Sequence, residues 1–473
     1  MTEPQDCRYL LTAHNDSLAQ TTVRPRFFVR TYGCQMNDRD SEKMTALLSR
    51  LGYDAAEGQD DADFILYNTC CVRESAEDKV FGHLSRLKRA KADKPGLMIG
   101  VCGCMTQQPD IAQKFQEKHP YVNLVFGTSN RHRLPEFLWR AIQTGKPVID
   151  ITESDELPEI EDIPVTTRDF PHKAGVNIMY GCDNFCAYCI VPYVRGRERS
   201  RPPEDILREA ESLADDGVKE VMLLGQNVNS YGGGVAFPEL LRQVNAISGL
   251  ERIRFMTSHP KDFSDELILA IRDLPKVCKH VHLPLQSGST RVLADMNRMY
   301  SQEDYLALAA RLQAAIPGIA ITTDIIVGYP GETEEDFLAT LDVARQIRFA
   351  GAFTFIYSKR SGTPAAERED TVPRKEISER FDRLTATLYP IMEEINRTKI
   401  GKVIDVMVED SQSAKGRADD HTLVHFTACK ELKPGDIVPV RINEAKTFYI
   451  SGDAIAPHPS SRNFSRAREC ESA

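Results

Sequence analysis

The sequence predicts an α/β protein with three folded parts, namely an N-terminal doubly wound parallel sheet, a central partial (βα)6 barrel, and a small C-terminal β-barrel or sandwich. Over most of the chain, short apolar runs alternate with amphipathic segments, as in parallel sheets covered by helices. After about residue 400 this pattern gives way to short strands punctuated by glycines, which is typical of a small β domain. The length of 473 residues accommodates several domains.

The composition indicates a folded cytoplasmic protein. Apolar residues make up 41% and charged residues 27%, but no apolar stretch approaches the roughly 18 residues of a membrane span. The polar N-terminus lacks the order of a secretory signal, so we expect a cytoplasmic location and no membrane association. The chain has twelve cysteines. Because thiols stay reduced in the cytoplasm, these cysteines are more typical of metal-binding or catalytic thiolates than of disulfides. A net charge of -10 argues against a protein whose whole surface is coated by nucleic acid, but it permits a local basic site.

The first folded part is expected over residues 26–148, after a flexible tail at 1–25. Its predicted strands lie at 27–31, 64–67, 97–101 and 123–126, and its predicted helices at 40–51, 74–90 and 134–144. This alternation implies a parallel sheet with helices on both faces. Residues 149–170 are read as an acidic linker, because seven acids and no base lie between Asp150 and Asp162.

The central domain is expected over residues 171–392. Six apolar strands, each followed by an amphipathic segment, predict the partial barrel; they lie near 175–180, 220–224, 252–257, 280–284, 322–327 and 352–357. Ser301 with Asp304, and Thr333 with Asp336, have the spacing of capping boxes at helix starts.

The C-terminal domain is expected over residues 393–456, before a tail at 457–473. A long amphipathic segment at 375–400 precedes it. The predicted strands lie at 403–408, 422–426, 437–442 and 447–451.

Three cysteines, Cys182, Cys186 and Cys189, form a CxxxCxxC motif directly after the first strand of the central domain. Three thiolates on one short loop can ligate three irons of a four-iron cluster, which leaves the fourth iron open for a substrate. A tetrahedral zinc site would need a fourth ligand, and no further Cys or His follows in the loop. Three structural cysteines are the alternative, but the loop lies where barrel enzymes place their active sites.

A second set of cysteines follows predicted strands of the N-terminal domain. Cys34 follows the first, Cys70 and Cys71 the second, and Cys102 and Cys104 the third. Because the carboxyl ends of parallel strands share one edge of the sheet, these thiols can converge. Spacing alone does not choose between Cys70 and Cys71. Cys102 is nearer the strand body, so we expect it in the core.

The motifs around both sets resemble the methylthiotransferase family of radical S-adenosylmethionine (SAM) enzymes from Arg26 to Asp453. The matching segments are TYGCQMN from Thr31, NTC from Asn68, YGCDNFCAYCIVPYVRGRERSRP from Tyr180, LGQNVNSYG from Leu224, HLPLQSGS from His282 and TDIIVGYPGET from Thr323. By this resemblance, an auxiliary 4Fe-4S cluster is held by Cys34, Cys70 and Cys104. The radical SAM 4Fe-4S cluster is held by Cys182, Cys186 and Cys189. Cys71 departs from the family pattern and leaves alternative ligation open.

The resemblance also implies the reaction. Two SAM molecules are used per product, one as methyl donor to sulfur at the auxiliary cluster and one as source of a deoxyadenosyl radical. The methylthio group is added to carbon 2 of N(6)-isopentenyladenosine at position 37 of tRNA. The clusters and SAM carry this chemistry, so no catalytic acid or base side chain is expected. The implied partners are tRNA, SAM and an electron donor such as flavodoxin or ferredoxin, and we expect a monomer.

The last 60 or so residues resemble the TRAM domain, an OB-like β-barrel that binds RNA in this family. Its usual Gly-Arg-Thr appears here as Gly416-Arg417-Ala418. Four arginines just beyond the cysteine loop are candidate RNA contacts, because guanidinium groups bind phosphates and stack on bases. They are Arg195, Arg197, Arg199 and Arg201.

Further candidates for contact with SAM or substrate are Tyr188 in the cysteine loop and Gln226, Gln286 and Asp324 at or near the ends of barrel strands. Three alternative functions remain open. A sister methylthiotransferase would act on threonylcarbamoyl-adenosine in tRNA or on a ribosomal protein aspartate. The protein could instead be a non-catalytic iron-sulfur protein that binds RNA, or a zinc-dependent RNA-binding module.

Overall fold

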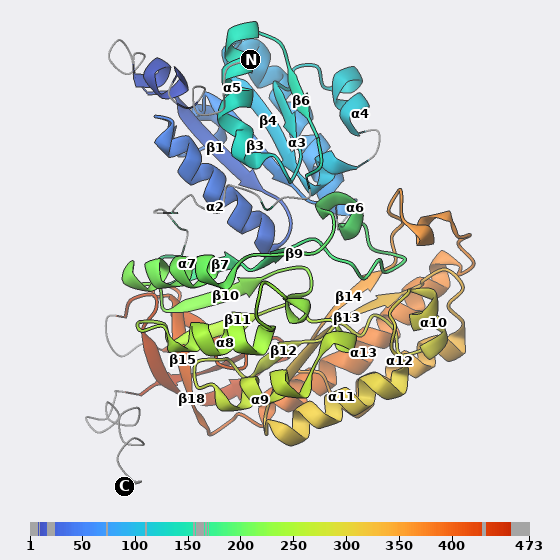
Figure 1. Ribbon diagram of the computed structural model, residues 1–473. Coiled ribbons are helices and arrows are strands. Elements are labelled where there is room, and N and C mark those ends of the chain that lie inside the picture. The colour runs from blue at the N-terminus through green and yellow to red at the C-terminus, as the bar shows by residue number, and fades with distance from the viewer. Residues whose placement is uncertain are drawn as a thin grey trace.

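The computed structural model describes residues 8, 10–16, 24–71, 74–108, 111–154, 157, 165, 168, 170–427 and 432–455. The tail at 457–473, most of the acidic linker and part of the tail predicted at 1–25 lie outside these residues. Residues 10–16 are helical, and Leu11 is buried against the N-terminal domain, so the prediction of a flexible tail is wrong for this segment. Figure 1 shows an N-terminal α/β domain, coloured blue to teal, above a central domain whose lower side carries the red C-terminal strands. Among the described residues, no helix is long and apolar enough to span a membrane.

The N-terminal domain contains a six-stranded parallel sheet in the order β2-β1-β3-β4-β5-β6. The strands are β1 (Arg26–Thr31), β2 (Asp54–Ala55), β3 (Phe64–Thr69), β4 (Met98–Gly103), β5 (Leu124–Phe126) and β6 (Val148–Asp150). The helices are α2 (Gln35–Arg50), α3 (Glu74–Asp93), α4 (Ile111–Lys118) and α5 (Leu134–Thr144). Three elements, β2, β6 and α4, were not predicted from the sequence.

Both faces of this sheet are covered, which confirms the doubly wound prediction. Leu66 of β3 packs in one apolar cluster with residues of α2 and α5. Its neighbour Ile65 packs in the opposite cluster with residues of α3 and α4. Successive side chains of a strand point to opposite faces, so a strand buried on both sides is apolar throughout.

The central domain has six barrel strands, as predicted, but their hydrogen bonding is interrupted. The strands are β7 (Lys173–Asn177), β10 (Glu220–Leu224), β11 (Arg252–Phe255), β12 (His280–His282), β13 (Ala320–Val327) and β14 (Gly351–Ile356). They form two parallel sheets, β11-β10-β7 and β12-β13-β14. An additional short pair, β8 (Met179–Tyr180) and β9 (Arg199–Ser200), is antiparallel.

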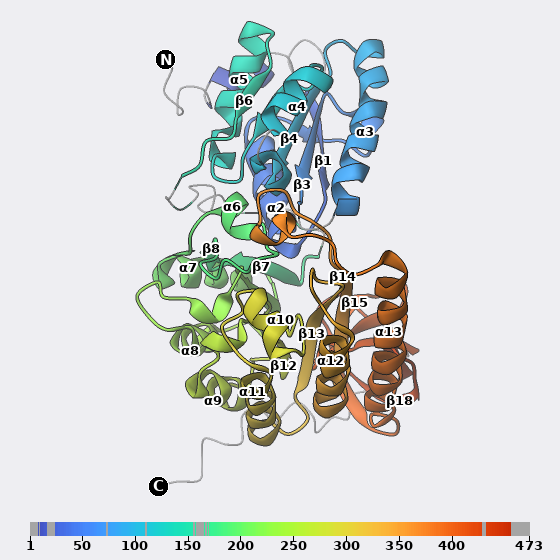
Figure 2. The ribbon, with the colours of Figure 1, turned by 90° about the vertical axis from the view of Figure 1, so that its right-hand side faces the viewer.

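Helices pack along the outer side of these strands (Figure 2). They are α7 (Pro203–Asp215), α8 (Phe237–Ala246), α9 (Asp265–Asp273), α10 (Thr290–Asp295), α11 (Gln302–Ala315), α12 (Glu334–Ile347) and α13 (Arg374–Arg397). The short helix α6 (Val191–Arg195) lies instead between this domain and the N-terminal domain. Both predicted capping boxes are present, at Ser301 with Asp304 and at Thr333 with Asp336. In each box, the hydroxyl and the carboxylate satisfy backbone N–H groups that the first turn leaves free.

The C-terminal domain is a closed barrel in the order β15-β16-β17-β19-β18, so the pattern that allowed a barrel or a sandwich is resolved as a barrel. Its strands are β15 (Val403–Asp410), β16 (Lys415–Ala418), β17 (Leu423–Thr427), β18 (Ile437–Ala445) and β19 (Tyr449–Ala454). The strand β16 was not predicted, because its residues have no alternating apolar pattern. Arg252 of β11 donates hydrogen bonds to the carbonyls of Asp405 and Arg417 and so docks the barrel on the central domain.

Candidate functional site

The CxxxCxxC loop follows β8 and is held by contacts on several sides. Gly181, just before Cys182, has φ +74°, and a Cβ there would lie 1.9 Å from the carbonyl oxygen of Arg197. Only glycine permits this approach to the segment that leads into β9. Farther along, the N–H of Ala187 donates to Met296, and the carbonyl of Ala187 accepts from Ala365, both at 2.9 Å. The loop is therefore fixed to the end of α10 and to the turn before α13.

Two polar side chains contact thiols of this loop. Arg298 donates from Nη1 to Cys186 Sγ at 3.4 Å, and Asn184 donates from Nδ2 to Cys182 Sγ at 3.5 Å. Burial raises the pKa of Cys182 to about 11 and that of Cys189 to about 12. These thiols therefore hold their protons near neutral pH until a metal displaces them.

The second cysteine set converges beyond the carboxyl ends of β1, β3 and β4, which are neighbours in the sheet. A Cβ at Gly33 (φ +129°) would lie 2.5 Å from Cys70 Cβ, so the first two cysteine loops touch. Cys104 Sγ lies 4.0 Å from Oδ1 of Asn37, which is near the start of α2. Cys34 is the residue after Gly33 and is exposed.

Cys71 and Cys102 differ in their surroundings. The thiol of Cys102 points into the core, with Sγ 3.8 Å from Met44 Sδ, which confirms the expected core position. Cys71 is fully buried and hydrogen-bonds with Cys104. That bond, together with the cation of Arg195, lowers the pKa of Cys104. The thiolate needed for ligation is thereby favoured at Cys104.

Each cysteine set can supply three thiolates to a four-iron cluster. In such a cluster each thiolate binds a different iron, so the sulfurs stand apart around it. Three cysteines from one loop, and three from adjacent strand ends, fit that requirement. Each set also receives a hydrogen bond from an arginine, at Cys186 and at Cys104.

The four candidate contacts for SAM or substrate have different environments. Tyr188 is packed with Val292 and Ile326. Gln226 contacts the sulfur of Met36 through Nε2, whereas its Oε1 is buried without a hydrogen-bond partner. Gln286 has φ +67°, and its N–H donates to the carbonyl of Asp324 at 2.8 Å. The structure thus joins Gln286 to Asp324, and Gln226 offers an unused acceptor, as a ligand site would.

The structure divides the four arginines that we expected to contact RNA. Arg195 and Arg201 are 5% and 4% exposed. Arg195 binds Asp40 and Asn37, and Arg201 binds Glu209 and the carbonyl of Asn177. Both guanidinium groups are buried and paired with acidic side chains of the protein, which argues against RNA contact by either arginine.

Arg197, by contrast, is largely exposed and lies over the ring of Phe185. Arg199 is half-buried and donates to the carbonyl of Arg195 at 2.8 Å. These two remain candidates for RNA contact.

Several residues around the thiols could not be predicted from the sequence. Arg298 and Asp40 carry no motif signal, because their role depends on contacts with residues more than a hundred positions away. Asn37 lies in the TYGCQMN segment, but its contacts with the carbonyls of Tyr32 and Thr69 are visible only in the fold.

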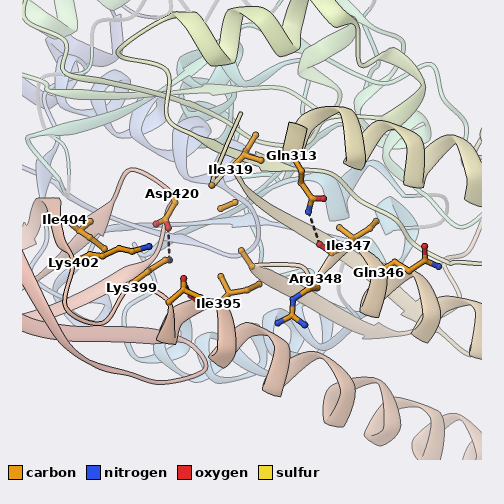
Figure 3. A pocket seen from close by; sticks show the side chains of 14 residues that line it. Gln313, Ile319, Gln346, Ile347, Arg348, Ile395, Lys399, Lys402, Ile404 and Asp420 are labelled. Carbon is orange, nitrogen blue, oxygen red and sulfur yellow. Dashed lines mark hydrogen bonds and ion pairs between the residues drawn. The ribbon is translucent and has the colours of Figure 1, made fainter. Parts of the chain in front are cut away.

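A cavity of about 530 Å³ lies away from both cysteine sets, between the central domain and the C-terminal barrel. Figure 3 shows Lys399 paired with Asp420 on one side of it and Arg348 on the other. Its lining includes none of the candidate site residues.

Comparison with known proteins gives two family matches and a set of close relatives. Residues 176–344 match the radical SAM superfamily, and residues 26–127 match the uncharacterized protein family UPF0004. The chain is 50% identical over 445 residues to the tRNA-2-methylthio-N(6)-dimethylallyladenosine synthase of Acetivibrio thermocellus, which covers 92% of each chain. It is 51% identical over 437 residues to the enzyme of that name from Caldicellulosiruptor saccharolyticus, covering 91% of this chain and 92% of the relative.

Among solved structures, the fold is similar to the radical SAM methyltransferase TsrM from Kitasatospora setae, solved with tryptophan and a SAM analogue bound. The TM-score is 0.52 at 15% identity, and the match covers 72% of this chain and 75% of that one. At this identity the likeness shows the fold alone, whereas half of the positions are shared with the curated relatives over nearly their whole length. The chain belongs to the family of the tRNA-2-methylthio-N(6)-dimethylallyladenosine synthases, within the radical SAM superfamily.

Proposed function

We propose that this protein is a radical SAM methylthiotransferase that adds a methylthio group to carbon 2 of N(6)-isopentenyladenosine at position 37 of tRNA. One observation carries the proposal: the chain shares 50% identity over 92% of its length with a protein named tRNA-2-methylthio-N(6)-dimethylallyladenosine synthase. Position 37 follows from the resemblance of the sequence motifs. The two convergent cysteine sets support the proposal, because they provide the ligands that such chemistry needs. Its cofactors are two 4Fe-4S clusters and SAM.

The cysteine assignments belong to this proposal. Cys182, Cys186 and Cys189 hold the radical SAM cluster, and the auxiliary cluster is held by Cys34, Cys70 and Cys104. A four-iron cluster with three thiolate ligands keeps one iron open and supplies the electron for radical chemistry with bound SAM. Cys104 is favoured over Cys102, whose thiol is turned away into the core.

The remaining residues bind and orient. The unpartnered Oε1 of Gln226 accepts a hydrogen bond from SAM or the adenine. Asp324 also binds SAM or the adenine. Its carboxylate is oriented by His282, whose Nε2 lies 3.4 Å away. Gln286 shares this edge through its backbone bond to Asp324. Tyr188 packs beside the radical SAM cysteines and limits access of water to them.

Partners and boundaries complete the proposal. The C-terminal barrel, together with Arg197 and Arg199, binds the tRNA. A flavodoxin or ferredoxin supplies the electrons. The protein acts as a monomer in the cytoplasm, where its tRNA substrate is. The auxiliary-cluster domain spans 26–148, the radical SAM domain 171–392 and the RNA-binding barrel 393–456.

The test is a reconstitution without oxygen, followed by incubation with SAM, reductant and separate tRNA pools that carry isopentenyladenosine or threonylcarbamoyl-adenosine. Mass analysis of the digested nucleosides should show the methylthio increment in the isopentenyl pool alone. An increment only in the other pool would overturn the substrate and keep the reaction. Full iron loading with no increment and no deoxyadenosine would identify a non-catalytic protein.

A further inference from the structure

Arg195 connects the two cysteine sets. It is the last residue of α6, the short helix that follows the CxxxCxxC loop, and α6 lies at the junction of the N-terminal and central domains in Figure 1. Its side chain is 4% exposed and crosses into the N-terminal domain. There its Nε donates to Cys104 Sγ at 3.2 Å, between residues 91 positions apart in the sequence.

The guanidinium of Arg195 is fixed in place by further contacts. Its Nη2 donates to Asn37 Oδ1 at 2.7 Å and to Asp40 Oδ2 at 3.1 Å. Arg131 also pairs with Asp40, so that carboxylate lies between two arginines. A fully buried ion pair adds little net stability, because desolvation offsets the attraction. The arrangement does, however, hold one N–H group aimed at the sulfur.

The radical SAM cysteines have a matching donor. Arg298 is 5% exposed and donates from Nη1 to Cys186 Sγ at 3.4 Å. Its other nitrogens are occupied, with Nη2 donating to the carbonyl of Pro284 and Nε to the hydroxyl of Tyr300, both at 3.0 Å. Each cysteine set therefore receives one N–H···S bond from a buried, oriented guanidinium.

We propose that Arg195 is a positioning residue for the auxiliary cluster, which holds Cys104 in place and raises the reduction potential of that cluster. This rests on the proposed function, because it requires a cluster at Cys34, Cys70 and Cys104. Hydrogen bonds to ligand sulfurs stabilise the reduced form, which carries one more negative charge. Since α6 continues directly from the radical SAM cysteines, the same residue also fixes the two cysteine sets relative to each other.

The experiment uses the full chain with Cys182→Ala, Cys186→Ala and Cys189→Ala, so that only the auxiliary cluster assembles. Its midpoint potential is measured by redox titration followed by electron paramagnetic resonance, with and without Arg195→Met. That substitution removes both donor and charge at similar volume. We expect a shift to a more negative potential. Arg195→Lys, which keeps a cationic donor, should fall between the parent and Arg195→Met.

Two matched controls separate this effect from the loss of any buried arginine. Arg201→Met removes a buried arginine that contacts Glu209 and Asn177 and should leave the potential unchanged. Arg298→Met should shift the radical SAM cluster instead, measured in the chain with Cys34→Ala, Cys70→Ala and Cys104→Ala. Circular dichroism and thermal melting check the fold, and if Arg195→Met does not fold, Arg195→Lys decides by the same criterion.

An unchanged potential in a folded, fully loaded Arg195 variant overturns the inference. So does an equal shift in Arg201→Met. Failure of the parent triple variant to assemble any cluster has a different meaning, since it would overturn the ligand assignment in the proposed function.

Discussion

Arg254 of the central domain donates from Nη2 to the carbonyl of Ala418 in the C-terminal barrel, across 2.9 Å. The same guanidinium donates to the carbonyl of Asp419 at 2.9 Å and to Glu220 Oε2 at 2.8 Å. It is 2% exposed. The Arg254 side chain thus pairs with the Glu220 carboxylate of its own central domain and donates to two carbonyls of the C-terminal barrel. It therefore helps to hold these two domains together.

Arg254→Met should destabilise the protein by about 3–5 kcal/mol, because it leaves the Glu220 carboxylate buried without its cation. Urea denaturation at pH 7 measures the loss. Arg242→Met is the control, since Arg242 is about half-exposed on α8 and pairs with Glu239 of its own helix. Surface changes of that kind cost within about 0.5 kcal/mol. An equal loss of unfolding free energy in both variants would contradict this prediction.

The junction between the N-terminal and central domains should weaken in acid. Burial by itself would raise the pKa of Glu209, but the charges of Arg39, Lys43 and Arg201 lower it to about 2. Because this value lies below the unfolded value of about 4.3, Glu209 contributes stability above pH of about 4.3. That contribution is lost as the pH falls toward 2.

Urea midpoints of the parent and of Glu209→Gln should therefore converge as the pH falls from 7 to 3. Glu211→Gln, at an exposed position of the same helix, should follow the parent throughout. A difference between Glu209→Gln and the parent that stays constant with pH would contradict the linkage.

The two cysteine sets should separate two activities. The triple change Cys182→Ala, Cys186→Ala and Cys189→Ala should abolish release of deoxyadenosine from SAM, because SAM loses the open iron. The change Cys34→Ala, Cys70→Ala and Cys104→Ala should leave that release intact and abolish the methylthio product. Each should about halve the iron bound, as measured by elemental analysis. Deoxyadenosine formed by the first variant would exclude the radical SAM assignment.

Cys102 and Cys104 should differ although they stand two positions apart. Cys102→Ala removes a core thiol that contacts Met44, so it should lower stability by about 1 kcal/mol and leave the iron content unchanged. Cys104→Ala should reduce the iron content. Cys71→Ala removes the hydrogen bond to Cys104 but no assigned ligand, so the iron content should stay the same. Loss of iron in Cys102→Ala and not in Cys104→Ala would reverse the assignment.

Arg197→Ala should weaken tRNA binding and lower the slope of log affinity against log salt concentration by about 1, as loss of one phosphate contact does. Filter binding at several salt concentrations measures both quantities. Arg208→Ala is the control, because Arg208 is 72% exposed on α7 and pairs with Asp205. An unchanged slope in Arg197→Ala would remove this residue from the RNA surface.

The class and order of the three folded parts, and the positions of the cysteine loops, could be predicted from the sequence because they depend on local patterns. Residues 64–67 are apolar at every position, which indicates a strand buried on both faces, and β3 is such a strand. The capping boxes at Ser301 and Thr333 are equally local, and both are present. Cys102 was placed correctly in the core from its position within the strand.

Only the packing of the chain distinguishes the buried arginines after the cysteine loop from the exposed ones. Arg195, Arg197, Arg199 and Arg201 alternate along one segment and look equivalent in sequence, yet the first and last are buried on acids from other elements. Arg298 could not be found from its neighbours either, because its contact with Cys186 joins residues 112 positions apart. The burial and hydrogen bonding of a side chain depend on how distant segments pack, whereas apolar periodicity and helix caps depend on residues that are close together in the sequence.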